Sequence, residues 1–157
     1  MTIREASAAD LENLVGLVGQ LREPPKVERG EREDYARALA EIVNDPGSTL
    51  LLAEADGRAV GALALYICPN LSHGGDPFAV IENVIVDAGT RRRGVGAALM
   101  REAIARARAV GCFKILLTSN NERTEAHRFY RRLGFCETHR AFHLYLKEWP
   151  TDGAGAR

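Results

Sequence analysis

The most constraining feature of the sequence is a long apolar run that leads, through a short turn, into a segment rich in arginine and glycine. The run FAVIENVIV covers Phe78–Val86, and RRRGVGAA follows at residues 91–98. An almost continuous apolar run of this length predicts a central strand covered on both faces. The glycines then open a predicted helix that reaches about Val110 and ends at Gly111. The sequence thus predicts a glycine-rich helix start just after a buried strand.

This helix start is suited to a phosphate group. The first turn of a helix leaves backbone N–H groups unpaired and partially positive, and glycines there let a phosphate approach them. Arg91, Arg92 and Arg93 add full positive charges. Two nucleotide fingerprints are disfavoured. The dinucleotide-binding pattern needs a glycine where Leu99 stands, and a P-loop needs lysine followed by serine or threonine, which Gly96-Ala97-Ala98 lacks.

The rest of the chain alternates between helical and strand-like periods, which predicts an α/β fold. Asp56-Gly57 separates two β-type runs and is a strong signal for a two-residue hairpin. The expected order is β-α-α-β-β-β-α-β-α-β(β), a mixed, mainly antiparallel sheet flanked by helices in one domain over residues 1–148, with a disordered tail over 149–157. The predicted strands are Ile3–Ala6, Thr49–Glu54, Arg58–Ile67, Phe78–Val86, Phe113–Thr118 and a final pair within Phe135–Leu146; the predicted helices are Asp10–Leu21, a segment around Tyr35–Val43, Gly94–Val110 and Thr124–Leu133.

The composition argues against several classes of protein. The 157 residues include 21 basic and 21 acidic side chains, whereas nucleic-acid binding usually shows as a basic excess. No apolar run reaches the roughly 18 residues that span a bilayer. The N-terminus carries charges where a signal peptide needs an apolar stretch, so we expect a cytoplasmic location. Cys68, Cys112 and Cys136 form no CxxC pair, so neither a disulfide framework nor a metal site is expected.

Two motifs in order resemble the GNAT superfamily of N-acyltransferases. The first is the basic-x-x-Gly-x-Gly pattern after a strand that ends in Val86-Asp87. The second is Ala126-His127-Arg128-Phe129-Tyr130 followed by Leu133-Gly134-Phe135, about 35 residues further on. The order of elements matches this family across residues 2–147. The resemblance implies an acetyl-CoA-dependent N-acetyltransferase that acts on a primary amine of a small molecule by direct transfer in a ternary complex.

The same resemblance implies which residues hold the cofactor and supply a proton. Tyr130 would donate a proton to the leaving thiolate; the alternative is a core aromatic with a hydrogen-bonded tip. The family often places an asparagine where Arg123 stands, so Asn121, or its neighbour Asn120, would contact the pantetheine arm instead. That arm would pair with the strand backbone like an added strand. The implied cofactor-binding residues are Val84, Ile85 and Val86 for the arm, and Arg91, Arg92, Arg93, Gly94, Val95, Gly96 and Ala97 for the pyrophosphate.

Glu82 is the predicted base. Attack on a thioester needs a neutral amine, and the pKa of an alkylammonium is roughly 10, so a group must take its proton. Glu82 interrupts the apolar run AVIENVIV, and a carboxylate is costly to bury without a partner or a cavity. We therefore expect it to face the acceptor cleft and to act directly or through water; a structural carboxylate is the alternative. Strand alternation predicts Asn83 on the opposite face.

The sequence leaves the acceptor open. IENVIV and Gly-Cys-Phe-Lys-Ile resemble glucosamine-phosphate N-acetyltransferases, whereas Ala126–Tyr130 resembles aminoalkylphosphonate N-acetyltransferases. Both imply a small amine with a phosphate or phosphonate group, selected by the loops Glu23–Arg32 and Asn70–Pro77, in which His73 is either an acceptor contact or a surface residue. The competing hypotheses are a protein or peptide acetyltransferase and a non-catalytic acyl-CoA-binding sensor or partner module. No nucleic-acid or membrane partner is expected, and a homodimer is the expected assembly.

Overall fold

The structure is a computed structural model that describes residues 1–20, 31–144 and 146. These residues form two compact units, the first made of residues 1–20 and 31–117 and the second of residues 118–144 and 146. The predicted tail over 149–157 and most of the predicted loop Glu23–Arg32 lie outside the described residues. Within them, no helix has the length and apolar character that a membrane span requires. The single domain over 1–148 stays a prediction.

The first unit contains a five-stranded sheet whose strands follow one another in chain order. Neighbouring strands are antiparallel except for the last two, which are parallel, with Ala79 opposite Ile115 and Val80 opposite Leu116. This confirms the predicted mixed, mainly antiparallel sheet. The strands are β1 (Thr2–Glu5), β2 (Ser48–Ala55), β3 (Arg58–Cys68), β4 (Phe78–Val86) and β5 (Ile115–Leu116).

The hairpin between β2 and β3 forms where the sequence predicts it. Asp56 and Gly57 have φ values of 51° and 70°, and Ala55 pairs with Arg58 across the turn. Positive φ at both central residues is the requirement of a type I′ turn, whose twist matches that of the flanking strands. The Asp-Gly pair therefore fixes the register of the longest antiparallel ladder in the unit.

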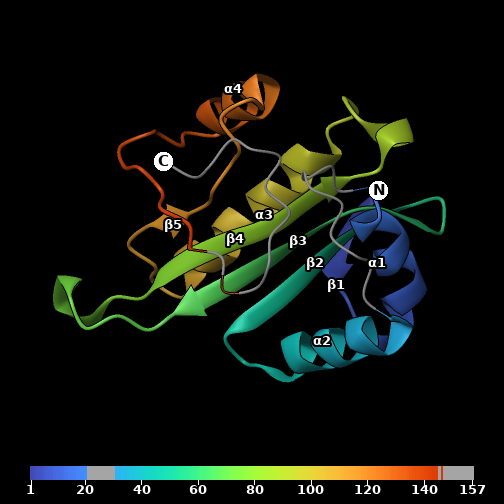
Figure 1. Ribbon diagram of the computed structural model, residues 1–157. Helices are drawn as coiled ribbons and strands as arrows, with labels where there is room; N and C mark the ends of the chain where they lie inside the picture. Colours follow the sequence, from blue (N-terminus) through green and yellow to red (C-terminus); the bar gives the residue numbers. More distant parts are fainter. Residues whose placement is uncertain (21–30, 145, 147–157) are drawn as a thin grey trace. The chain divides into compact units, whose positions relative to one another are not determined.

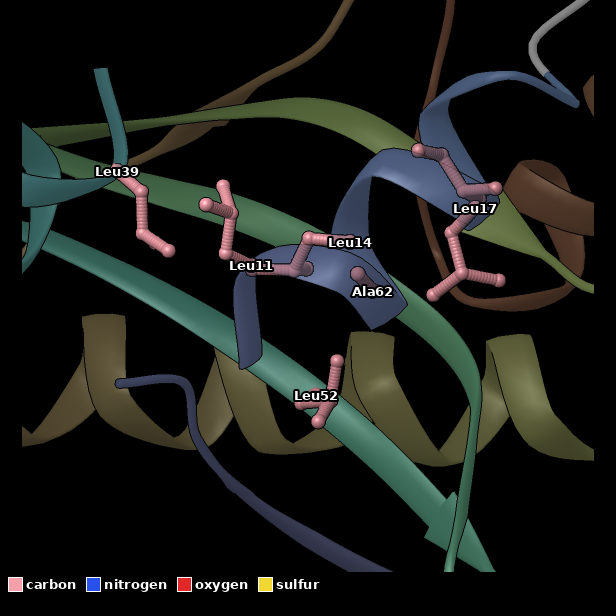
Figure 2. Close-up of a cluster of buried hydrophobic side chains, with 7 residues drawn as sticks. Leu11, Leu14, Leu17, Leu39, Leu52 and Ala62 are labelled. Atoms are coloured by element: carbon pink, nitrogen blue, oxygen red, sulfur yellow. The ribbon is translucent and has the colours of Figure 1, made fainter. Parts of the chain in front are cut away.

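Helices cover both faces of this sheet (Figure 1). The helices α1 (Leu11–Val18) and α2 (Arg32–Asn44) pack on one face, and α3 (Val95–Ala109) packs on the other. All three lie where the apolar periodicity predicts them. We call the first face, which carries Ala62 and Ala64 of β3, the α1/α2 face. Figure 2 shows its core, in which side chains from both helices and two strands meet: Leu11, Leu14, Leu17, Leu39, Leu52 and Ala62.

The opposite face depends on a close approach between β3 and α3. A Cβ atom at Gly61 would lie 2.9 Å from Cγ1 of Val95 and 2.9 Å from the carbonyl oxygen of Ile85. A glycine in a strand interior often marks such an approach. Large, fully buried side chains fill the remaining space between the sheet and α3: Leu51, Leu63, Leu65, Ile81, Leu99 and Met100.

A β-bulge interrupts β4 at its centre. Ala64 pairs with Glu82 and Ala62 with Ile85, so Leu63 faces both Asn83 and Val84. Asn83 has a φ of +54°, a left-handed conformation typical of bulges. Asn83 and Ala64 both line a cavity on the α1/α2 face. Glu82 pairs with Ala64, so Glu82 lies on this face as well. The prediction that Glu82 and Asn83 lie on opposite faces is therefore wrong, because the extra residue breaks the alternation.

The second unit contains α4 (Thr124–Arg132), which confirms the predicted helix. Gly134 follows with a φ of +92°, a conformation that ends helices readily. The predicted strand pair within Phe135–Leu146 does not form among the described residues, since residues 135–144 include no strand. Phe142 and Leu144 alternate as a strand would, yet they are 92% and 84% exposed. Alternation alone makes no strand, because each strand needs a hydrogen-bonded neighbour.

Candidate active site

The loop between β4 and α3 has the geometry of an anion site. It passes through a short 3-10 turn, η3 (Ala88–Thr90), and enters α3 at Val95, with Gly94 as the N-cap. Arg92 and Gly94 have φ values of 63° and 83°, and such left-handed residues help successive N–H groups to converge in an anion-binding concavity. The N-cap residue of α3, Gly94, has no side chain that could cap the helix. The N–H groups of its first turn can therefore bind a ligand.

The side chains of this loop carry positive charge, and Asp87 at its start is an acid that interacts with Arg91. Arg91, Arg92 and Arg93 are exposed, and Gly96 and Ala97 are half-buried. The Nε atom of Arg91 donates to the carbonyl oxygen of Val86 at 3.5 Å, which holds this side chain beside the end of β4. Backbone donors together with guanidinium groups are the donor set that a pyrophosphate requires. The predicted cofactor segment is thus one continuous basic loop.

Gln20 attaches the end of α1 to the beginning of this loop. Its Nε2 donates to Oδ2 of Asp87 at 3.0 Å, and its Oε1 accepts from the N–H of Ala88 at 3.0 Å. The Asp87 side chain also accepts from the N–H of Gly89. These hydrogen bonds, the one from Gln20 above all, lower the pKa of the Asp87 carboxyl. The Gln20 side chain therefore positions both the Asp87 carboxylate and the backbone N–H of Ala88, directly after β4.

The edge of β4 beyond Val80 has no strand beside it among the described residues. β5 pairs with β4 only at Ala79 and Val80, whereas β3 pairs with β4 as far as Val86. The backbone from Ile81 to Val86 therefore presents one open edge that leads to the basic loop. An extended group can hydrogen-bond to such an edge as an added strand would. Val84, Ile85 and Val86, the residues predicted for the pantetheine arm, lie on this stretch.

Glu82 lies on the α1/α2 face with a tyrosine as its neighbour. Tyr66 pairs with Val80, one diagonal step from Glu82 on the same face. Burial raises the pKa of the Tyr66 phenol, and the charges of Glu82 and Asp45 raise it further. The phenol therefore stays protonated at neutral pH and can donate a hydrogen bond. Glu82 itself is exposed, which corrects the expectation of a carboxylate within a strand covered on both faces.

An apolar cavity is lined in part by Asn83, the residue that follows Glu82 in the chain. Its volume is about 110 Å³, and it lies between α1, α2 and the sheet. Polar groups are few in its wall, which includes Asn83 and Tyr35. The side chains that line it from the helices and strands include Leu11, Leu14, Leu39, Ala62 and Ile85.

The second unit contains the other predicted site residues. Tyr130 is buried on α4, with the rings of Phe129 and Phe135 at 5.2 Å and 6.1 Å between centroids. Nε2 of His127 donates to the carbonyl oxygen of Asn120 at 2.9 Å, so Asn120 is engaged within its own loop. Asn121 is exposed. The structure therefore gives the predicted cofactor loop, strand edge and base to the first unit, and the predicted acid and asparagine to the second.

Comparison with known proteins decides the family. Residues 16–135 match the model of the acetyltransferase (GNAT) family. The chain belongs to the GNAT family of acetyltransferases. It is 32% identical to a glucosamine 6-phosphate N-acetyltransferase of Trypanosoma brucei brucei, over 93% of this chain and 96% of the relative. It is 28% identical to an aminoalkylphosphonate N-acetyltransferase of Salmonella typhimurium, over 89% and 88%. A putative acetyltransferase from Agrobacterium tumefaciens has the same fold, with a TM-score of 0.86, 30% identity, and 92% and 99% of the two chains covered.

Membership in the GNAT family agrees with the co-substrate predicted from the sequence, acetyl-CoA. An aminoglycoside N-acetyltransferase in complex with CoA matches this chain with a TM-score of 0.77 and 25% identity, over 92% of this chain and 93% of the other. The basic loop and the open β4 edge supply the donors that CoA needs, so the GNAT co-substrate acetyl-CoA fits the chemistry of the residues present. Among the described residues, no group of three or more His, Cys, Asp or Glu side chains could hold a metal ion.

Sequence reasoning missed two residues that lie beside the predicted site residues, Gln20 and Tyr66. Gln20 contacts Asp87 across 67 positions of the chain, and Tyr66 reaches the neighbourhood of Glu82 only through the β3–β4 register. Neither lies in a motif, so no local signal could have identified them. Burial raises the pKa of the Cys112 thiol, which makes this cysteine a weak nucleophile at neutral pH.

Proposed function

We propose that this GNAT acetyltransferase transfers the acetyl group of acetyl-CoA to the primary amine of a small acceptor that carries a phosphate or phosphonate group. The transfer is direct and occurs in a ternary complex. Supporting it, the two relatives named above act, by their names, on glucosamine 6-phosphate and on aminoalkylphosphonates. The observation that carries the proposal is the position of Glu82, exposed on the α1/α2 face beside Tyr66 and on the open stretch of β4.

In this proposal each residue has a separate task. Residues Arg91–Ala97 bind the pyrophosphate, and the β4 backbone at Val84–Val86 orients the pantetheine arm. Glu82 accepts a proton from the acceptor ammonium, directly or through water, which leaves the neutral amine that can attack the thioester carbonyl. Tyr66 stays protonated and donates a hydrogen bond to the acceptor. As the carbon–sulfur bond breaks, Tyr130 donates its proton to the departing thiolate.

An acceptor panel tests this function. Thiol release from acetyl-CoA is measured with glucosamine 6-phosphate, 2-aminoethylphosphonate, a polyamine and a lysine peptide, for the wild type and for Glu82→Gln. We expect turnover with a phosphorylated or phosphonylated amine, and a defect in Glu82→Gln that shrinks as the pH rises, because solvent then supplies the free amine. The pH profile of kcat/KM separates this role from a structural one.

Other results would contradict the proposal in different ways. Binding of acetyl-CoA without thiol release for any amine would indicate a non-catalytic acyl-CoA-binding module. Turnover with the peptide alone would indicate a protein acetyltransferase. A Glu82→Gln variant that matches the wild type over the whole pH range would leave the transfer in place and remove Glu82 from it.

A further inference from the structure

An unfilled apolar cavity lies on the α1/α2 face, between the two helices and the sheet. Its volume is about 110 Å³, and aliphatic side chains such as Val15 of α1 and Ile42 of α2 line it from the helices. From the sheet, Ala62 and Ala64 contribute only methyl groups, which leave the space that larger side chains would fill. An empty apolar space forfeits packing contacts and lowers stability. An apolar ligand of matching size would restore those contacts.

The cavity reaches the surface beside the β4 bulge. Asn83 lines the cavity and is itself exposed, with a φ of +54°. It lies between Glu82, the proposed base, and Val84, the first of the three residues proposed to orient the pantetheine arm. The exposed Ala38 of α2 also lines the cavity. A group bound at the bulge can therefore extend into the cavity while it stays on the α1/α2 face.

The acyl chain of the donor is the group that the proposed function brings to this entrance. With the pyrophosphate at Arg91–Ala97, the pantetheine arm runs back along the open edge of β4 from Val86 to Val84. Its thioester end then lies next to Asn83, one residue further along the strand. Since the amine attacks from the side of Glu82, the thioester carbonyl must be open to the α1/α2 face, which brings its alkyl substituent to the mouth of the cavity.

The lining of the cavity suits a hydrocarbon chain and excludes a charged group. None of the described residues that line it carries a charge, and its polar side chains are Asn83 and Tyr35. A phosphate would lose its hydration there without gaining a partner, so the charged end of the proposed acceptor does not fit. Each methylene group that enters the cavity instead raises the affinity of the ligand about fourfold.

The volume of the cavity sets the length of chain that fits. An apolar cavity of about 150 Å³ binds benzene, which has six carbon atoms. In proportion, the 110 Å³ available here holds about four carbon atoms. The chain beyond the carbonyl carbon has one carbon in acetyl, three in butyryl and seven in octanoyl. Butyryl therefore fills most of the cavity, whereas octanoyl exceeds it.

We propose that this cavity is an acyl subsite, and that the enzyme transfers propionyl and butyryl groups from their CoA thioesters as well as acetyl groups. The inference rests on the proposed function, because it uses the same thioester position and the same base. In each transfer the carbon–sulfur bond breaks and a carbon–nitrogen bond forms. The ammonium loses two protons: one goes to Glu82, and the other replaces the proton that Tyr130 gives to the thiolate. An ammonium and an acyl-CoA thus give an amide, the free thiol of CoA and one proton.

The test compares acyl chains first by binding and then by turnover. Calorimetry without an acceptor measures the affinity of the wild type for acetyl-, butyryl-, hexanoyl- and octanoyl-CoA. Because butyryl has two more methylene groups than acetyl, butyryl-CoA should bind about 5-fold to 15-fold more tightly than acetyl-CoA, and octanoyl-CoA should bind less tightly than butyryl-CoA. With glucosamine 6-phosphate as acceptor, kcat/KM for butyryl-CoA should at least equal that for acetyl-CoA.

Three variants change the cavity or leave it as it is. Val15→Phe fills it from α1 and should abolish the preference for butyryl-CoA over acetyl-CoA. Ile42→Ala enlarges it from α2 and should move the preference toward hexanoyl-CoA. Val43→Phe is the matched control, because it adds the same atoms to an exposed residue of α2 that does not line the cavity, and it should keep the wild-type preference. Melting temperatures show whether each variant folds; if Val15→Phe does not, the shift in Ile42→Ala decides alone.

Failure of the acyl subsite and failure of the proposed function give different results. Equal affinities of the wild type for acetyl-CoA and butyryl-CoA, or a preference that Val15→Phe retains, would overturn the subsite and leave acetyl transfer intact. A change in Val15→Phe that is confined to the KM of the acceptor would assign the cavity to the acceptor and also overturn it. Tight binding of butyryl-CoA without transfer of the butyryl group would overturn the broader activity. Absence of thiol release with every amine would contradict the proposed function, and the calorimetric preference would still decide whether the cavity holds the acyl chain.

Discussion

The two ends of β4 build their binding groups in different ways. The end that leads into α3 offers backbone N–H groups and three arginines within Arg91–Ala97, one short stretch of sequence. The half of β4 that runs up to Glu82 instead brings together side chains from neighbouring strands, with Tyr66 and Glu82 on one face. A backbone cradle binds what every member of a family shares, whereas assembled side chains recognise what differs. If both proposed sites are correct, the cofactor site is encoded by neighbouring residues in the sequence and the acceptor site by residues far apart in it.

The largest effect is expected from damage to the backbone cradle. Gly96→Glu puts a carboxylate at the start of α3, where the phosphate oxygens bind, and like charges at an interface cost several kcal/mol. CoA affinity should fall on the order of 10³-fold or beyond detection. Calorimetry with CoA measures the affinity, and circular dichroism verifies the fold. Gly96→Ala is the matched control and should retain most of the affinity. Wild-type affinity in Gly96→Glu would show that the phosphates do not bind at the start of α3.

A somewhat smaller effect is expected at the predicted acid. Tyr130→Phe deletes one hydroxyl, so kcat should fall by about 10² to 10⁴, the usual contribution of a positioned general acid. CoA affinity should change little, because the hydroxyl acts on the leaving sulfur. The kcat defect should persist at high pH, unlike that of Glu82→Gln. Phe129→Leu on the same helix is the control for packing; an equal kcat loss in that variant would indicate that Tyr130 has a structural role.

The sequence predicted the strand and the helix on either side of the proposed cofactor loop well, because the evidence for them is local. A buried run, a turn and a glycine-rich helix start follow one another, and the observed Phe78–Val86 strand and Val95–Ala109 helix confirm them. The proposed acceptor site depends on which residues of β3 and β4 pair with each other. Alternation along the sequence predicts such pairing only where the strands are regular. The bulge at Asn83 changed that register, and no residue pattern announced it. Likewise, the strand pair predicted within Phe135–Leu146 does not form among the described residues.

The smallest effect is expected at Gln20, which connects the end of α1 to the loop between β4 and α3. Gln20 lies two residues after α1, which lines the apolar cavity, and it hydrogen-bonds to Asp87 and Ala88 at the start of the proposed cofactor loop. Gln20→Leu removes two hydrogen bonds, each with a net value of about 1 kcal/mol. We expect the Kd for CoA to rise roughly threefold to tenfold, since part of that energy fixes the loop in its binding conformation.

The pH dependence of a second variant separates loop positioning from general stability. In the wild type the pKa of Asp87 is lowered, so this carboxylate stays charged and bonded above about pH 4. The stabilisation it gives is lost only as the pH falls through that lowered value. Wild-type CoA affinity should therefore show no titration from this contact between about pH 5 and 8.

Gln20→Glu places a second carboxyl against Asp87, and this like-charge neighbour raises the pKa of the introduced group toward that pH range. At pH 8 both groups are charged and repel, so CoA should bind more weakly than to Gln20→Leu. As the pH falls toward 5, the introduced carboxyl takes up a proton and donates to Asp87 as the amide did, so affinity should recover toward the wild type. Titration calorimetry at several pH values measures this recovery, with Gln20→Leu as the variant that cannot recover. If the two variants instead follow parallel pH profiles, Gln20 stabilises the fold alone and does not link α1 to the cofactor loop.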